Sequence, residues 1–226
     1  MHKQTFMKKL FYLLIVMITA VSCTVKEEKK STPLEFTDSI LLVTVEKMGG
    51  ASIHEALWAR KSHREYTNVP LSLEELSGVL WAAAGQNRED GHLTAPSALA
   101  LYPIQTYAFM EGGVYLYDAK TNTLTRQVEG DHRSVAAMQE FANTASVNIV
   151  YIADLSVYEG KNIPVEKVIN LCGMDAAGYA ENVNLYTAAH GLKSITRGSA
   201  KAEEIITLLN LAPTRYIFIL AQSVGK

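Results

Sequence analysis

The sequence predicts an α+β fold with a mostly antiparallel sheet flanked by helices. Three observations lead to this prediction: two capping boxes that open helical apolar patterns, a hairpin signal between two strand-like runs, and no regular β-α-β alternation. The 226 residues are 48% apolar and 19% charged, which is enough to bury the core of one domain. The formal net charge of −2 does not suit a protein that binds nucleic acid through a basic surface.

Two capping boxes mark the starts of the first helices. Residues 52–55 and 72–75 both have Ser followed three positions later by Glu. The first box predicts a helix that runs toward Arg60, and the second predicts a helix that Gly85 ends. Residues 94–97 form a turn that can open a further helix. Apolar spacing and composition predict the remaining helices over residues 135–145, 165–190 and 202–209.

Runs of β-branched and aromatic residues predict the strands. Residues 105–110 and 114–117 flank Glu111-Gly112-Gly113, which is typical of a hairpin turn. Further strands are expected over residues 124–128, 147–153, 193–196 and 216–221.

The N-terminus reads as an export signal and not as part of the fold. A basic leader is followed by a twelve-residue apolar run, Leu10 to Val21, which is short of the roughly 20 residues that a membrane-spanning helix needs. With Cys23 directly after small residues, the segment resembles a bacterial lipoprotein signal. We therefore expect a signal peptide at residues 1–22, a lipidated flexible tether at residues 23–35 and a folded domain at residues 36–226. A plain secretory signal with an incidental cysteine is the alternative.

The stretch RKSHREY, residues 60–66, concentrates positive charge in a slightly acidic chain. Arg60 and Arg64 lie four positions apart and would share a face in helical geometry. With the hydroxyl of Ser62, two guanidinium groups suit a phosphate monoester, because Arg makes forked, charge-assisted hydrogen bonds to phosphate oxygens. The alternative is a solvated helix end whose cations complement the helix dipole.

Several familiar catalytic motifs are missing from the sequence. It contains no G-x-G-x-x-G, P-loop, G-x-S-x-G or H-E-x-x-H pattern. No Cys or His pair has the spacing of metal ligands. Cys172 lies in an apolar helical pattern, so we expect a buried, inert thiol there.

Four blocks of sequence carry a family resemblance. RKSHREY and the Pro-Leu-Ser-Leu-Glu-Glu-Leu that starts at Pro70 are similar to an Arg-Arg-Ser-x-Arg-x-Phe opening and the helix after it. Residues 80–85, 95–103 and 175–192 resemble the next elements in the same order. Together these blocks resemble the FMN-dependent nitroreductase family, and within it the branch that contains the thiazoline and oxazoline dehydrogenases. The resemblance covers about residues 45–225 and implies a homodimer with FMN at a two-fold interface.

The resemblance implies roles for the cationic stretch. Arg60, Lys61 and Ser62 would hold the FMN phosphate and ribityl chain. Arg64 would face the N1–O2 edge of the flavin, where a cation stabilises the negative charge of the reduced ring. Lys226 is all that corresponds to the basic C-terminal tail that helps to bind phosphate in many relatives.

A second group of residues is implied to line the flavin ring. Pro96, Ser97 and Ala98 would line it from the partner subunit. Leu99 stands where the family usually has glycine and could crowd the flavin. Ala177 belongs to the same group, and the backbone N–H of Gly178 would approach flavin N5.

The function implied is that of an exported, lipid-anchored FMN oxidoreductase at the cell envelope. Hydride or electrons would pass by ping-pong chemistry from a donor, through the flavin, to a nitro, quinone or similar small acceptor, with no catalytic side chain. NAD(P)H is the family's usual donor, and a membrane quinol or redox protein is the alternative outside the cytoplasm. The chain contains no Lys-Tyr dipeptide, which disfavours azoline oxidation. The competing hypothesis is a non-catalytic lipoprotein of the same fold that binds a flavin or another small ligand.

Overall fold

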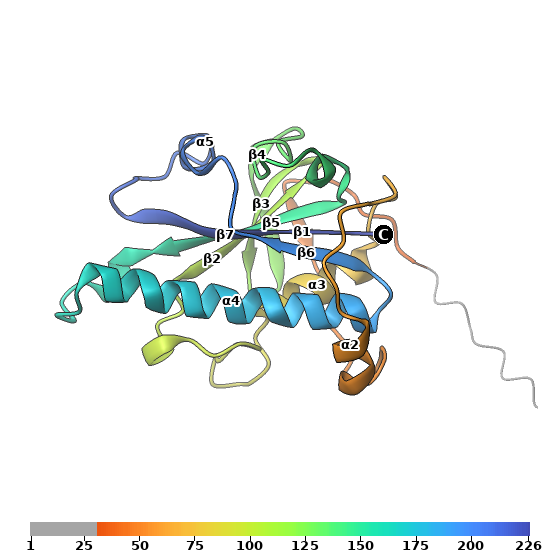
Figure 1. The fold of residues 1–226 in the computed structure, drawn as a ribbon, viewed down its shortest axis with the longest axis horizontal. Helices are drawn as coiled ribbons and strands as arrows, with labels where there is room; N and C mark the ends of the chain where they lie inside the picture. The colour runs from red at the N-terminus through yellow and green to blue at the C-terminus, as the bar shows by residue number, and fades with distance from the viewer. Residues whose placement is uncertain (1–30) are drawn as a thin grey trace, which may run out of the picture. The chain divides into compact units, whose positions relative to one another are not determined.

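One antiparallel sheet with helices on both faces organises residues 31–226, the part of the chain that the computed structural model describes (Figure 1). The predicted α+β class is thereby confirmed. The predicted signal peptide (residues 1–22), Cys23 and the first residues of the predicted tether lie outside the described residues.

The sheet has seven strands in the order β1-β4-β3-β2-β5-β7-β6, and every neighbouring pair is antiparallel. The predicted hairpin is confirmed, with β2 and β3 joined at residues 111–112. Short connections link β2, β3 and β4, while β5, β6 and β7 are separated along the chain by helices. The strands are β1 (Ser39–Leu41), β2 (Ile104–Met110), β3 (Gly113–Asp118), β4 (Thr123–Glu129), β5 (Val147–Asp154), β6 (Lys193–Arg197) and β7 (Tyr216–Gly225).

Both predicted capping boxes form and start their helices. The Ser72 hydroxyl accepts the Glu75 N–H at 3.2 Å, and the Glu75 carboxylate accepts the Ser72 N–H at 2.7 Å. Ser52 and Glu55 make the same reciprocal pair. Each box satisfies two helix N–H groups that would otherwise lack a partner. The helices are α2 (Ile53–Ala59), α3 (Leu73–Ala84), α4 (Val165–Ala189) and α5 (Ala202–Leu208).

The alternation of side chains along the strands divides the core into two layers. On one face, α3 and α4 pack on the sheet through residues such as Leu76, Tyr151 and Tyr179. On the other face, α5 packs through Ile205 against Phe109 and its neighbours. In Figure 1, α4 runs across the front, below β7, and α5 lies above β7. Within residues 31–226, no helix is both long and apolar enough to cross a membrane.

The helix predicted over residues 135–145 is wrong, since only a short 3-10 turn, Glu140–Thr144, forms there. Side chains take the place of helical hydrogen bonds in this segment. Arg197, Asn148 and Arg133 donate to the carbonyl oxygens of residues 136, 142 and 145 at 3.0, 2.9 and 3.0 Å. Tertiary hydrogen bonds therefore override the local helical preference.

The tether predicted for residues 23–35 extends too far into the chain. Glu74 accepts the N–H of Thr32 at 3.0 Å and its hydroxyl at 2.6 Å, and Thr32 O accepts the Leu73 N–H at 2.9 Å. Leu34 packs against the core. These contacts place residues 32–35 in the folded unit.

Candidate functional site

The cationic stretch leaves helix α2 and continues as extended chain. The helix ends at Ala59, and Arg60 caps it with φ −59° and ψ 123°. The His63 N–H then donates to Ser194 O of β6 at 3.0 Å. The prediction that Arg60 and Arg64 share a helical face is wrong, because pairing with β6 replaces the helix.

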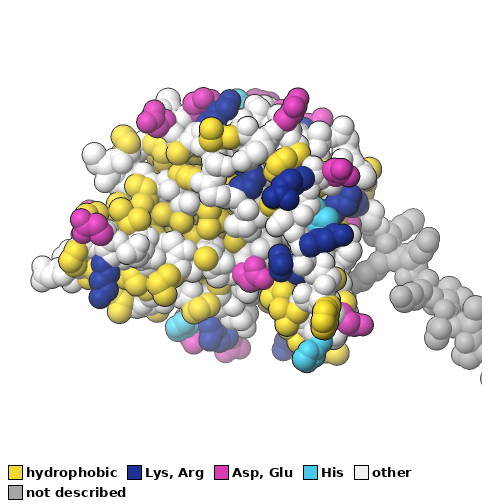
Figure 2. Space-filling model, in the orientation of Figure 1, with side chains coloured by type: hydrophobic (Ala, Val, Ile, Leu, Met, Phe, Trp, Pro, Cys, Tyr) yellow, Lys and Arg dark blue, Asp and Glu magenta, His cyan; other side chains and the backbone are white. Residues whose placement is uncertain are grey.

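The predicted phosphate-binding residues are exposed and have no internal partners. Within residues 31–226, the side chains of Arg60, Lys61, Ser62 and Arg64 make no ion pair or hydrogen bond with the protein. Figure 2 shows Lys and Arg side chains gathered over β6 on the right of this face. These free donors are the groups that an anionic ligand requires.

His63 lies beneath this charged surface. Its Nδ1 atom is buried and has no hydrogen-bond partner among the described residues. Burial, together with nearby Lys61 and Lys193, holds the pKa of His63 below its ordinary value. These surroundings therefore favour the neutral form of the imidazole.

His63 should make the fold less stable in mild acid. Because its pKa is lower in the folded than in the unfolded chain, its stabilisation is complete above about pH 6.5 and is lost as pH falls through the folded value. Urea unfolding of the wild type and His63→Gln at pH 7.5 and 5 would measure this contribution. The wild type should lose more stability than the variant over this range, and equal losses would contradict the prediction.

Lys226 lies at the same end of the sheet, but its side chain is already paired. Its Nζ atom is 2.9 Å from a carboxylate oxygen of Glu75, and its carbonyl oxygen accepts the Thr67 N–H at 2.9 Å. Its cofactor-binding role stays a prediction, and the Glu75 carboxylate would compete with a phosphate for this ammonium group.

The turn after α3 is held by an acid that the sequence analysis missed, Asp175. Its carboxylate accepts the Ser97 hydroxyl at 2.6 Å and the Ala98 N–H at 3.0 Å. The Ser97 hydroxyl is thus directed into the protein, while Leu99 is 66% exposed. Asp175 interrupts the apolar positions of α4 that include Cys172 and Tyr179. An acid at an apolar position of a helix is the sequence signal that could have pointed to Asp175.

Ala177 and Gly178 lie in the middle of α4. Ala177 is exposed and lines an open groove of about 650 Å³ with Met174 and Ile217. Gly178 lies inside an uninterrupted helix, where each N–H is engaged by the carbonyl oxygen four residues earlier. The approach of this N–H to flavin N5 stays a prediction.

The two groups of predicted site residues do not meet within one chain. Thr187 contacts Ser194 at 2.9 Å, and Ser194 accepts the N–H of His63, so the cationic stretch lies by the C-terminal end of α4. Asp175 is twelve residues earlier in this helix, a rise of about 18 Å. The turn at residues 97–102 therefore lies beside one half of α4, and the cationic stretch lies beside the other half.

Comparison with known proteins identifies the fold. The sequence profile described as the nitroreductase family matches residues 57–226. The chain belongs to the nitroreductase family. A Methanocaldococcus jannaschii protein named as a nitroreductase is 30% identical over 168 residues, which is 70% of this chain and 84% of that protein.

Solved nitroreductase structures agree with this assignment. A crystal structure assigned as a nitroreductase of Ralstonia eutropha JMP134 is 30% identical, with a TM-score of 0.79, and the match covers 87% of this chain and 92% of that one. Another, from Desulfovibrio desulfuricans in complex with FMN, is 20% identical with a TM-score of 0.53, and the match covers 76% of this chain and 84% of that one. At 20% identity the second likeness shows the fold alone.

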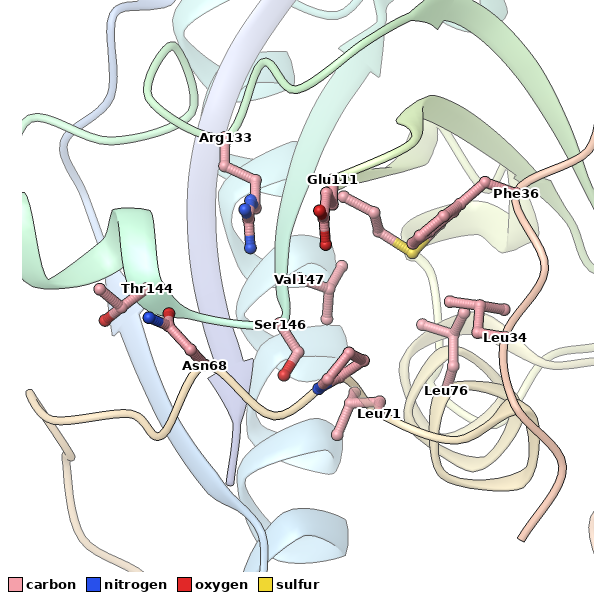
Figure 3. A pocket seen from close by; sticks show the side chains of 12 residues that line it. Leu34, Phe36, Asn68, Leu71, Leu76, Glu111, Arg133, Thr144, Ser146 and Val147 are labelled. Atoms are coloured by element: carbon pink, nitrogen blue, oxygen red, sulfur yellow. The ribbon is translucent and has the colours of Figure 1, made fainter.

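The phosphate end of an FMN fits the nitroreductase chain described here. Arg60, Lys61, Ser62 and Arg64 present free donors, and Glu65 is the one acid among residues 60–66. By contrast, the enclosed cavity in Figure 3, between Phe36, Leu76 and Arg133, has a volume of about 30 Å³. Such a space holds a water molecule or two and not a flavin ring.

Proposed function

We propose that this nitroreductase-family chain is an FMN-dependent oxidoreductase that passes electrons from a donor to a nitro, quinone or similar small acceptor. Members of the family are oxidoreductases, and the observation that carries the proposal for this chain is the set of free donors at residues 60–64. NAD(P)H is the proposed donor, with a membrane quinol or redox protein as the alternative.

The proposed roles of the chain's residues are those that the family resemblance implies, and their charge and exposure support them. Arg60 and Ser62 would bind the phosphate, with Lys61 assisting, and Arg64 would stabilise the negative charge of the reduced ring. Bound FMN supplies the hydride chemistry. The protein supplies position and positive charge, so no side chain acts as a nucleophile.

A second copy of the chain completes the site in this proposal. The α4–β7 groove exposes Ile169 (42%) and Met174 (69%), and exposed apolar surface of this kind favours self-association. A two-fold axis near the middle of α4 places the turn of one copy beside the cations of the other. The dimer thereby joins the two halves that one chain keeps about 18 Å apart.

The location and family branch are parts of the same proposal. The apolar leader and Cys23 favour a lipid anchor at the cell envelope, periplasm-facing or surface-exposed. Labelling of the full chain with a radioactive fatty acid, lost in Cys23→Ser, tests the anchor, and an unlabelled wild type excludes it. We place the chain in the branch with the thiazoline and oxazoline dehydrogenases, without azoline oxidation.

A spectrum of the purified protein from residue 24 onward tests the proposed reaction. The proposal predicts a yellow protein whose flavin absorbance bleaches with NADH or dithionite and returns on addition of a nitroaromatic or a quinone. A colourless protein that takes up no added FMN would contradict it and favour a non-catalytic binding protein. Bound FMN that no acceptor reoxidises would exclude the acceptor classes named here.

A further inference from the structure

The turn that joins α3 to β2 has an unusual backbone. Leu99, Ala100 and Tyr102 have φ values of 58°, 53° and 47°, in the left-handed region that residues with a side chain rarely adopt. Such a conformation persists only where the surrounding structure imposes it.

Asp175 contacts this turn from helix α4. One carboxylate oxygen accepts the Ser97 hydroxyl at 2.6 Å and the other accepts the Ala98 N–H at 3.0 Å. The Ser97 oxygen in turn accepts the Tyr102 N–H at 2.9 Å, which closes the turn. A single carboxylate thus ties both ends of the left-handed segment to α4.

The hydrogen bonds of the Asp175 carboxylate go to the turn, and no charged side chain pairs with it among the described residues. It is 5% exposed and has no ion-pair partner among residues 31–226. The hydroxyls of Tyr158 and Tyr179 nearby are buried without hydrogen-bond partners in the described part of the chain. Burying a carboxylate is costly unless donors compensate it, and the Ser97 hydroxyl and the Ala98 N–H are the donors here.

The turn at residues 97–102 exposes side chains to solvent, and it does not face the cationic stretch of the same chain. Pro96, Leu99 and Ala100 are exposed, while the cationic stretch of the same chain lies about 18 Å along α4. A second copy packed antiparallel along α4 would bring this surface to the cations of its neighbour.

We propose that Asp175 is a positioning residue that fixes the turn of one subunit over the flavin held by Arg60 of the other. This inference rests on the proposed function. Asp175 does not touch the flavin and acts through Pro96 and Leu99. Loss of its charge should loosen the turn and impair the neighbouring subunit's site.

Equilibrium FMN titration of full-length apoprotein gives the first test. Asp175→Asn keeps the shape but cannot accept the Ser97 hydroxyl with its amide nitrogen, and the Kd for FMN should rise at least about tenfold. Glu166→Gln, which neutralises an exposed acid on the same helix, is the matched control and should leave the Kd unchanged. Ser97→Ala removes one donor of the turn and should act in the same direction if Asp175→Asn does not fold. An unchanged Kd in both turn variants would overturn the proposal.

A mixed dimer separates positioning from a loss of stability. One tagged chain carries Arg60→Ala with an intact turn, and the other carries Asp175→Asn with intact cations. If the turn acts across the interface, the cations of the Asp175→Asn chain and the turn of the Arg60→Ala chain form one intact site. Half of the FMN sites then bind with wild-type affinity. If Asp175 acts within its own chain, or only on stability, no site keeps wild-type affinity and the inference is overturned. A wild type that binds no FMN would instead overturn the proposed function, and the inference with it.

Discussion

Replacing Arg60 by alanine should raise the Kd for FMN by about 10- to 150-fold, the equivalent of the roughly 1.5–3 kcal/mol that a hydrogen bond to a charged group contributes. The side chain is exposed and has no partner within the described residues. Its loss therefore removes a contact to the phosphate and none within the folded chain. Fluorescence titration of the apoprotein with FMN measures the change.

Two controls make the Arg60 result specific. The thermal midpoint of Arg60→Ala should match that of the wild type, because no internal contact is lost. Lys120→Ala removes an exposed cation in the turn between β3 and β4 and should leave FMN affinity unchanged. Equal affinities of Arg60→Ala and the wild type would show that the phosphate binds elsewhere.

Replacing Asn148 by leucine should lower the free energy of unfolding by about 3 kcal/mol or more, because it leaves a buried cation and a buried hydroxyl without their acceptor. Asn148 Oδ1 accepts from Arg197 Nη2 at 3.0 Å and from the Ser223 hydroxyl at 2.6 Å. Arg197 is 5% exposed, and burial lowers its pKa. Its other acceptors, Ser223 Oγ and two carbonyl oxygens, are also neutral.

Thr106→Val is the matched control for a buried polar group. Thr106 is 3% exposed, and its hydroxyl has no partner in the described part of the chain. Removing an unpaired hydroxyl should be neutral or stabilising. Urea unfolding of both variants provides the comparison, and a loss for Asn148→Leu no larger than that for Thr106→Val would contradict the proposed role of the network.

Local sequence signals predicted the elements whose ends they define. The boxes at Ser52 and Ser72 started α2 and α3 where expected, and apolar spacing predicted residues 165–190 for the helix found at Val165–Ala189. The hairpin between β2 and β3 followed from its turn residues. These signals act over a few residues, which is why a single sequence reveals them.

Features set by distant contacts were not predicted. The segment at 135–145 gives up its helix to side chains from β5 and β6, and Arg60 and Arg64 lose helical geometry because residue 63 pairs with β6. Asp175 was missed because its partners, Ser97 and Ala98, are more than 70 residues away in the chain. Local periodicity carries no information about such contacts.

A comparison of FMN with riboflavin on the same apoprotein tests the central claim most directly. The two ligands share the ring and ribityl chain and differ in the phosphate that Arg60, Ser62 and Lys61 are proposed to bind. Two charge-assisted contacts predict that FMN binds about 100-fold or more tightly than riboflavin. Equal affinities, or no binding of either ligand, would contradict the account.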